Sequence, residues 1–426
     1  MCLSPSRSLQ NWFHMADFEG SEVLSFNRDE HVRFFLDSLE SLPAHYTSLD
    51  AARLTAVYFS VIGLDIMNEI DRVDKARICN FIYGLQLHEI RDETDNLCKE
   101  CNAELPSSSS CSSSGHVLRH GGFIGSSYLG QPFRSDYQYP ADPSSISSNS
   151  NSKAGKNDDP CSCIPFEYMQ GHLAMAYTSL ATLITLEDDL ERLDKKALIS
   201  SISELQQENG SFSATKVGTE SDMRFLYCAC AVSSFLNDFS GINIEKAISF
   251  IDSCITYEGG FALIENAEAQ GGATYCAIAS LILMNSLDKI PRQKIRNLMT
   301  WCNQRIHRGY NGRTNKVPDS CYSFWIGASL EMLNAFQDTN LDECVEFILR
   351  DCQLHKWNEN GGFSKTPGDY PDILHTFYSI SWLALRFGNN KQQQQEREQE
   401  GDANLNFKSI HAALGICICG PNVILS

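Results

Sequence analysis

A short phrase of glycine followed by an aromatic residue recurs along this chain, and its spacing restricts the possible folds. The phrase occurs as HGGF, NGSF, EGGF, RGY and NGGF, which end at Phe123, Phe212, Phe261, Tyr310 and Phe363. The steps between these aromatic residues are 89, 49, 49 and 53 residues. An apolar segment with helical spacing follows each phrase, and another helical segment precedes most of them. A period of roughly fifty residues with two helices per unit predicts a helical repeat protein in which strands contribute little.

The composition excludes several classes of partner. The 426 residues carry a formal net charge of −19, and no basic stripe is present that would bind nucleic acid. No apolar run reaches the roughly 18 residues that a membrane span needs, and the N-terminus lacks the apolar core of a secretion signal. The 17 cysteines lie mostly in apolar segments such as LYCACAV, where cysteine behaves as a small hydrophobic residue. We therefore expect a reduced, cytoplasmic protein.

Polar, low-complexity stretches define the expected domain boundaries. We expect residues 1–24 to form a flexible extension, residues 25–390 one repeat domain, and residues 391–426 a polar linker and C-terminal tail. Two insertions, at about residues 92–119 and 134–163, fall in the long step of the repeat and are rich in serine and asparagine. Such stretches carry too few apolar groups to order themselves, so we expect disordered decorations on one domain.

An aspartate and a cysteine two residues apart indicate a metal site. Asp319 and Cys321 lie where a repeat helix begins, and backbone that is not yet regular lets both side chains converge on one ion. The equivalent point of the next repeat carries His375, and consecutive repeats in a closed ring present equivalent positions side by side. A catalytic zinc takes three protein ligands and keeps one position open, which this set allows. The same residues also fit a helix cap, a core cysteine and a hydrogen-bonded histidine.

Cationic side chains stand directly before this pair. Arg313 and Lys316 add two fixed positive charges, and Tyr322 adds a hydroxyl donor. Such a cluster suits a diphosphate. The alternative is a solvated loop, which is where most arginines and lysines lie.

Longer motifs connect these residues to a known family. The stretch GRTNKVPDSCYSFW, followed by GGF and PDILH, resembles the β subunits of protein prenyltransferases, and most closely those of type I protein geranylgeranyltransferases. Further motifs continue the resemblance from about residue 31 to residue 387: HVRFF, SLDAARLT, GFIGSSYLG, GHLAMAYT, DMRFLYCA and GGATYCAIASL. The resemblance implies an all-α fold, an α/α toroid of about six helix pairs, which agrees with the repeats.

The resemblance also implies a catalytic centre. Asp319, Cys321 and His375 match the zinc ligands, with one zinc per chain, and the open position receives the substrate cysteine. A metal-bound thiol loses its proton and stays nucleophilic at neutral pH. The diphosphate-binding residues of the family, which offset charge on the leaving group, match Arg313, Lys316 and Tyr322.

The peptide site is implied in the same way. Arg224 matches the residue that reaches the C-terminal carboxylate of the substrate through water, and His172 and Glu220 match residues that line the same site. Tyr227 matches a residue on the wall between lipid and peptide. The implied reaction transfers a geranylgeranyl group from geranylgeranyl diphosphate to the cysteine thiol of a C-terminal CaaX motif, in which X is typically leucine.

Specific positions bear on rate and on the choice of lipid. The family usually has histidine where this chain has Gln270, and an amide can donate to a diphosphate but carries no charge. Thr55 matches a tryptophan that shortens the isoprenoid tunnel of farnesyltransferases, and with Phe59 one turn on it leaves room for a fourth isoprene unit. Lys365 replaces a carboxylate that places Mg²⁺ in farnesyl- and Rab-type enzymes, so we expect no Mg²⁺ requirement.

The resemblance implies partners as well. A prenyltransferase α subunit completes an obligate heterodimer, and the substrates are geranylgeranyl diphosphate and CaaX-ending proteins such as Rho-type small GTPases. Two alternatives stay open. One is the β subunit of a Rab-type geranylgeranyltransferase, which PDSCYS and KTPGDY also resemble, although Lys365 and HVRFF favour type I. The other is a catalytically impaired scaffold that binds the α subunit or a lipid, which Gln270 favours and the complete zinc set opposes.

Overall fold

The computed structural model describes six stretches of the chain, residues 25–87, 121–126, 170–216, 220–353, 361–389 and 405–417. The expected N-terminal extension, both serine-rich insertions and most of the expected polar linker lie outside these residues.

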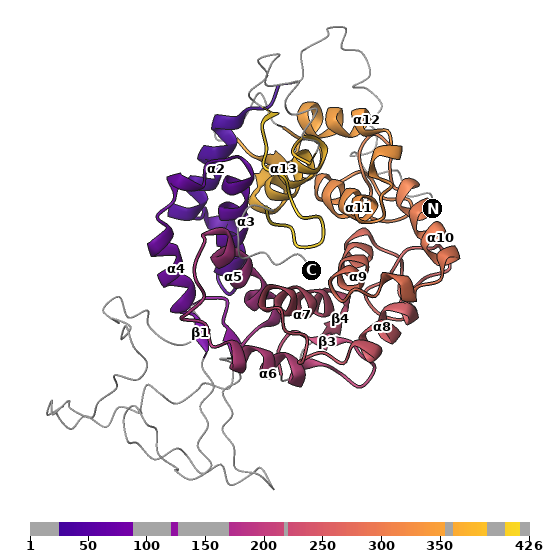
Figure 1. Ribbon diagram of the computed structural model, residues 1–426. Helices are drawn as coiled ribbons and strands as arrows, with labels where there is room; N and C mark the ends of the chain where they lie inside the picture. Colours follow the sequence, from indigo (N-terminus) through magenta and orange to yellow (C-terminus); the bar gives the residue numbers. More distant parts are fainter. Residues whose placement is uncertain are drawn as a thin grey trace, which may run out of the picture.

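The described residues form two concentric rings of helices (Figure 1). The inner helices are α3 (Arg53–Ile66), α5 (Leu173–Thr185), α7 (Met223–Leu236), α9 (Gly271–Leu283), α11 (Ser320–Met332) and α13 (Ile373–Phe387). The outer helices are α2 (Arg28–Glu40), α4 (Lys75–Tyr83), α6 (Lys195–Leu205), α8 (Ile244–Ser253), α10 (Arg292–Asn303) and α12 (Leu341–Glu346), which continues into a π-helical turn at Phe347–Cys352. Each inner helix packs against the next, and α13 packs against α3. The ring is therefore closed, and the predicted all-α toroid is confirmed.

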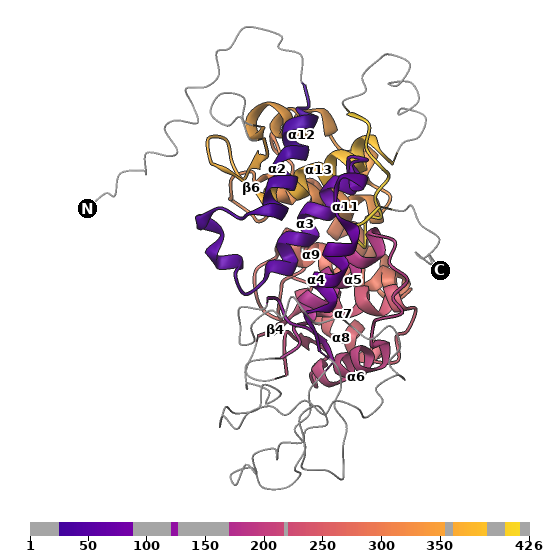
Figure 2. The same cartoon turned by 90° about the vertical axis from the view of Figure 1, so that its left-hand side faces the viewer.

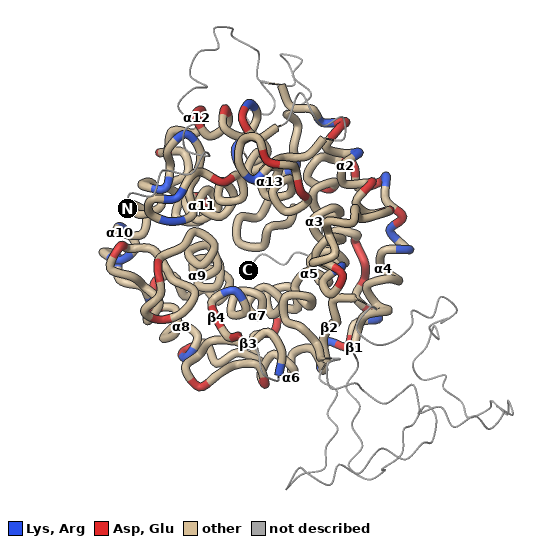
Figure 3. Tube along the Cα trace, turned by 180° about the vertical axis from the view of Figure 1, so that it is seen from behind, with Lys and Arg blue, Asp and Glu red and all other residues tan. Residues whose placement is uncertain are grey.

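Composition separates the two rings. Inner helices consist mainly of small and apolar residues and are buried almost all round, because they have neighbours on both sides and outer helices behind them. Outer helices are amphipathic: α8 buries Ala247, Phe250 and Ile251 and exposes its other face. Charged residues accordingly gather on the outer ring (Figure 3). Among the described residues, no helix is both long and apolar enough to cross a membrane.

The recurring phrase forms the turn between an outer helix and the inner helix that follows. Its aromatic residue is buried and pairs with a residue just after the outer helix: Gln86 with Phe123, Gln206 with Phe212, Ile255 with Phe261, Ile306 with Tyr310, and Gln353 with Phe363. Gly210, Gly259 and Gly309 have φ angles of +91°, +102° and +114°, which favour glycine. The strand pairs of the described residues are all antiparallel and lie at such turns: β1 (Gln86–Leu87) with β2 (Gly122–Phe123), β3 (Phe212–Ser213) with β4 (Ser221–Asp222), and β5 (Phe363–Ser364) with β6 (Pro371–Asp372).

Hydrogen bonds bring the starts of the inner helices to one rim of the toroid. A backbone N–H at the start of each helix donates to a carbonyl in the loop before the next: Leu54 to Gly125, Leu173 to Ala214, Met223 to Leu263, Gly271 to Gly312, and Ser320 to Lys365. The N–H of Ile373 completes the circle by donating to the hydroxyl of Tyr46 at 3.0 Å. Side chains at these helix starts therefore share one rim, which we call the N-terminal rim.

The first and last repeats meet through a buried histidine. His31 of α2 places its Nε2 2.8 Å from Oε1 of Gln353, and its Nδ1 accepts the N–H of Gly362 at 2.9 Å. Both ring nitrogens are thus engaged by residues from the other end of the domain. Both views show α13 beside α2 and α3 at this junction (Figure 1 and Figure 2).

Residues 405–417 enter the centre of the ring (Figure 1). The hydroxyl of Tyr227 donates to the carbonyl of Ala413 at 3.0 Å, and that of Tyr177 donates to the carbonyl of Leu414 at 3.0 Å. Sequence analysis groups this segment with the C-terminal tail, yet most of its apolar side chains are buried in the core. The packed part of the chain therefore resumes after the linker.

Candidate functional site

Two neighbouring inner helices bring together a carboxylate, a thiol and an imidazole. Asp319 caps α11 by accepting the N–H of Cys321 at 3.1 Å, and His375 is the third residue of α13. One potential ligand atom from each side chain lies within 4.8 Å of the others. Nε2 of His375 is 3.3 Å from Oδ1 of Asp319. This donor set fits zinc and leaves a fourth tetrahedral position for a substrate atom.

Asp372, which sequence analysis did not single out, holds the imidazole. Its carboxylate caps α13 by accepting the N–H of His375 at 2.9 Å, and its Oδ2 lies 2.6 Å from Nδ1 of His375. With Nδ1 engaged, Nε2 is directed toward the other candidate ligands, as is common for metal-binding histidines. Asp372 occupies the same cap position as Asp319 one repeat earlier, so an alignment of the repeats would have pointed to it.

The grouped side chains shift one another's pKa. Burial lowers the pKa of His375, but hydrogen bonds to Asp319 and Asp372 and their charges outweigh burial and raise it to about 9. Burial and the nearby Asp319 raise the pKa of Cys321 well above its ordinary value. A bound cation would reverse the shift of the thiol, so metal binding here would release protons.

Side chains that could donate hydrogen bonds to an anion lie beside this cluster on the N-terminal rim. Gln270 is the N-cap residue of α9, and its Nε2 donates to the hydroxyl of Tyr322 at 3.3 Å. Burial raises the pKa of Tyr322, so the hydroxyl keeps its proton at neutral pH. Arg313 pairs with Glu268 at 3.1 Å, and both side chains are about half exposed. The arginine is therefore accessible to an anion that competes with Glu268.

The two candidate lysines are exposed at the same rim. Nζ of Lys365 lies 3.9 Å from Oδ2 of Asp319, which places this ammonium next to the candidate metal ligands. Lys316 lies in the loop before α11, three residues after Arg313, whose carbonyl accepts its N–H at 3.3 Å.

The candidate peptide residues gather at the starts of α5 and α7. The guanidinium of Arg224 lies 2.6 Å from Asp222 and 2.9 Å from Glu220, and these carboxylates raise its pKa against the lowering effect of burial. His172 is the N-cap residue of α5 and accepts the N–H of Ala174. Burial lowers the pKa of His172, while the charge of Glu220 acts in the opposite direction. Asp222 also caps α7 and was not predicted.

The candidate lipid residues face the interior of the ring. Oγ1 of Thr55 lies 3.9 Å from the sulfur of Met175, and the ring centroid of Phe59 lies 5.0 Å from that of Phe377. The hydroxyl of Tyr227 lies 3.2 Å from that of Tyr177 on the neighbouring α5. Further aromatic residues of the inner helices continue this wall: Tyr58, Tyr177, Tyr275, Phe324 and Tyr378.

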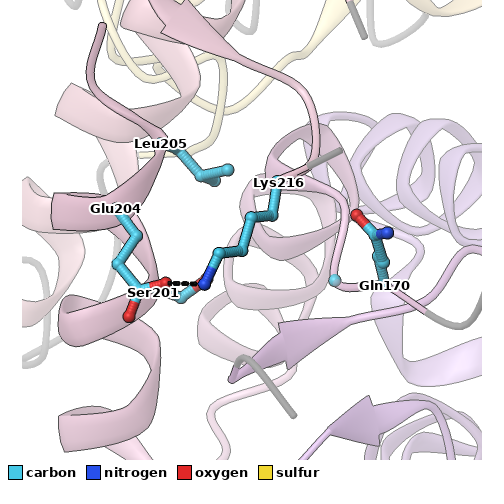
Figure 4. A pocket seen from close by; sticks show the side chains of 6 residues that line it. Gln170, Ser201, Glu204, Leu205 and Lys216 are labelled. Atoms are coloured by element: carbon cyan, nitrogen blue, oxygen red, sulfur yellow. Dashed lines mark hydrogen bonds and ion pairs between the residues drawn. The ribbon is translucent and has the colours of Figure 1, made fainter. Parts of the chain in front are cut away.

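A pocket lies apart from the candidate metal ligands, between α6 and the segment after β3 (Figure 4). Its lining includes Gln170, Ser201, Glu204, Leu205 and Lys216. Lys216 and Glu204 pair with each other at 2.9 Å. An adjoining pocket extends to His172. Neither lining includes Asp319, Cys321 or His375, so the candidate metal chemistry lies outside both pockets.

Comparisons with known proteins match most of the chain. A model of the prenyltransferase alpha-alpha toroid domain matches residues 26–416. The geranylgeranyl transferase type-1 subunit beta of Arabidopsis thaliana is 34% identical over 378 residues, which cover 86% of this chain and 87% of that protein. The protein of the same name from Dictyostelium discoideum is 35% identical over 366 residues, covering 85% of this chain and 91% of that one. The protein farnesyltransferase subunit beta of Schizosaccharomyces pombe is 26% identical over 386 residues, covering 85% of this chain and 79% of the other.

A solved structure has the same architecture. The structure of Candida albicans protein geranylgeranyltransferase-I complexed with GGPP aligns with a TM-score of 0.68 and covers 92% of this chain and 96% of that chain. The two sequences are 21% identical over the alignment, so this likeness supports the toroid fold.

Proposed function

This chain belongs to the prenyltransferase α-α toroid family and, within it, to the type-1 geranylgeranyl transferase β subunits, and we propose that it is the catalytic subunit of a zinc-dependent protein geranylgeranyltransferase type I. The reaction moves a geranylgeranyl group from its diphosphate to the cysteine thiol of a C-terminal CaaX motif.

The cluster of Asp319, Cys321 and His375 carries this proposal. Its donor types suit zinc, and three protein ligands leave one position for the substrate sulfur. Zinc held there would supply Lewis acidity that lowers the pKa of the substrate thiol, so that a thiolate is present at neutral pH. The chain's own part is to hold the ligands: Asp319 through the N–H of Cys321, and His375 through Asp372.

The donors beside the cluster bind the diphosphate. Arg313, Lys316 and Lys365 supply positive charge, and the hydroxyl of Tyr322 and the amide of Gln270 supply hydrogen bonds. Such donors stabilise the charge that develops on the leaving diphosphate as the carbon–oxygen bond breaks. The ammonium of Lys365 makes Mg²⁺ unnecessary, because it provides the charge that a metal ion would otherwise bring.

The remaining sites bind the lipid and the peptide. The isoprenoid lies along the aromatic wall, beside Thr55 and Phe59. We assign the preference for 20 carbons to the small side chain of Thr55. Arg224, with His172 and Glu220 beside it, receives the C-terminal carboxylate of the peptide through water. A prenyltransferase α subunit completes the enzyme, which acts in the cytoplasm on CaaX-ending proteins such as Rho-type small GTPases.

Transfer by the co-expressed α and β subunits tests the proposal. We expect transfer from geranylgeranyl diphosphate to peptides that end in leucine, weaker transfer from farnesyl diphosphate, and none by the β subunit alone. Thr55→Trp narrows the tunnel and should shift the preference toward farnesyl diphosphate.

Metal analysis separates an enzyme from a scaffold. Cys321→Ala and His375→Ala should each lose zinc and activity while circular dichroism shows that the helices remain. Zinc stoichiometry that is unchanged in both variants would refute the metal assignment. A complex that binds zinc but transfers neither lipid would support the scaffold alternative.

A further inference from the structure

A partly buried polar cluster lies under the loop that carries Arg313 and Lys316. Two bonds anchor the loop just before its turn: the N–H of Asn311 donates to the carbonyl of Arg305 at 2.8 Å, and the carbonyl of Gly312 accepts the N–H at the start of α9. After the turn, the N–H of Asp319 donates to the carbonyl of Tyr310 at 2.9 Å. No candidate role in diphosphate or metal binding accounts for the side chains beneath this loop.

The hydroxyl of Thr314 lies at the centre of the cluster. Nη1 of Arg305 donates to this hydroxyl at 2.9 Å, and the hydroxyl donates to Oε1 of Glu258 at 3.3 Å. The guanidinium also lies 5.1 Å from the ring centroid of Trp301. Glu258 comes from the glycine-aromatic turn of one repeat, whereas Arg305 follows the outer helix of the next. One threonine hydroxyl thus joins two repeats to the loop.

Burying these charged groups costs free energy of folding, so the cluster is a poor way to stabilise the fold. Arg305 is only 6% exposed, and desolvation lowers its pKa against the raising effect of Glu258. Among the described residues, Nε of Arg305 and Oε2 of Glu258 are buried atoms without a hydrogen-bond partner. Buried charged groups with unsatisfied atoms contribute little to stability compared with apolar packing. What the cluster does provide is a pair of side-chain hydrogen bonds to the loop at Thr314.

The charged side chains of the loop are held only weakly by their own contacts. Arg313 pairs with the half-exposed Glu268, and Lys316 is exposed. Exposed ion pairs of this kind fix side-chain geometry poorly. Thr314 immediately follows Arg313 and stands two residues before Lys316, so fixing it restricts the backbone from which both cations project.

We propose that Thr314 is a positioning residue for diphosphate binding: Arg305 and Glu258 hold its hydroxyl and thereby aim Arg313 and Lys316 at the diphosphate. This inference rests on the proposed function, because it assigns the ligand of these two cations. Neither Thr314 nor its two partners touches the diphosphate itself.

Thr314→Val in the α–β complex tests the inference, with Thr314→Ser as the matched rescue variant. Valine keeps the shape and removes the hydroxyl, whereas serine restores it. We expect Thr314→Val to raise the KM for geranylgeranyl diphosphate and the inhibition constant of inorganic pyrophosphate by about tenfold, because misplaced cations lose part of their charge-assisted hydrogen bonding to the diphosphate. The KM for the peptide and the zinc content should stay unchanged, and serine should restore both diphosphate constants.

Two further variants keep the result interpretable. Thr300→Val removes a hydroxyl that bonds within the exposed face of α10, and it should leave the pyrophosphate constant unchanged. Thr314→Ala replaces Thr314→Val in the experiment if the valine variant unfolds. It also lacks the hydroxyl and should weaken the binding of pyrophosphate in the same way. A wild-type complex that neither binds the lipid diphosphate nor transfers it would overturn the proposed function. A functional wild type whose Thr314→Val and Thr314→Ala variants bind pyrophosphate as tightly as Thr314→Ser would overturn the positioning role alone.

Discussion

Replacing Asp372 by asparagine tests whether a carboxylate holds His375 ready for a metal. Asparagine can still accept the N–H of His375, which Asp372 accepts at 2.9 Å, so the cap of α13 is kept. What it removes is the charged acceptor 2.6 Å from Nδ1 of the imidazole. The substitution therefore separates helix capping from ligand orientation.

Ligand orientation and helix capping by Asp372 affect different quantities, zinc affinity and protein stability. Outer partners of metal-binding histidines typically change metal affinity by about 10- to 100-fold, which corresponds to roughly 1.4–2.7 kcal/mol. A lost N-cap costs about 1 kcal/mol of stability. Asp372→Asn should therefore weaken zinc binding by about 10- to 100-fold with little change in Tm, whereas Asp372→Ala should lower Tm as well.

Competition with a chromophoric zinc chelator measures the affinity, and Asp194→Asn provides the control. Asp194 caps α6 by accepting the N–H of Ala197 at 3.0 Å, so the exchange is chemically the same on an outer helix of another repeat. Zinc affinity in Asp372→Asn equal to that of wild type would refute the orienting role. An equal loss in Asp194→Asn would mean that the effect is not specific to His375.

Three further outcomes are expected. Gln270→His places a group that can carry charge beside Tyr322 and should raise the single-turnover rate by about 10- to 100-fold, and an unchanged rate together with unchanged diphosphate binding would mean that the amide already fills the role. Lys365→Asp should make transfer respond to added Mg²⁺, whereas a wild-type enzyme that already requires millimolar Mg²⁺ would contradict the assigned role of the ammonium. Without zinc, the pKa of His375 is raised from 6.5 to about 9, so its contribution to stability is fully present below pH 6.5 and is lost as the pH rises through about 9. The Tm of chelator-treated protein should fall across this window, and a slope that persists in His375→Ala would assign it to other groups.

The sequence predicted the architecture because one local requirement repeats. Every turn needs a glycine with positive φ and an aromatic residue that fills the core, so the phrase recurs at each repeat. The same regularity predicted that Asp319, Cys321 and His375 would meet. The equivalence is offset by one residue: Cys321 is the second residue of its helix and His375 is the third of the next. The cap position that repeats without offset belongs to Asp319 and Asp372.

Features that depend on particular tertiary contacts were not predictable in this way. In the sequence Thr314 resembles an ordinary loop residue. Only the folded structure shows that its hydroxyl bonds to both Arg305 and Glu258. Residues 405–417 follow a polar stretch and match no repeat. Nothing in their local pattern indicates that they lie in the centre of the ring, where tyrosines of the inner helices donate hydrogen bonds to their carbonyls. Glu258 is 56 residues from Thr314, and the tyrosines that bond to residues 413 and 414 are 186 and 237 residues from them, so a local sequence pattern contains none of these contacts.

The contact between α3 and α13 makes the toroid a single folding unit. An open solenoid can fold from any repeat outward and tolerates the gain or loss of a repeat, because each unit needs only its neighbours. Here the circle is completed by helices from opposite ends of the domain, so the chain closes a very long loop before the last interface forms. We therefore expect slow, cooperative folding, and deleting any one helix pair leaves two buried faces without a partner to cover them.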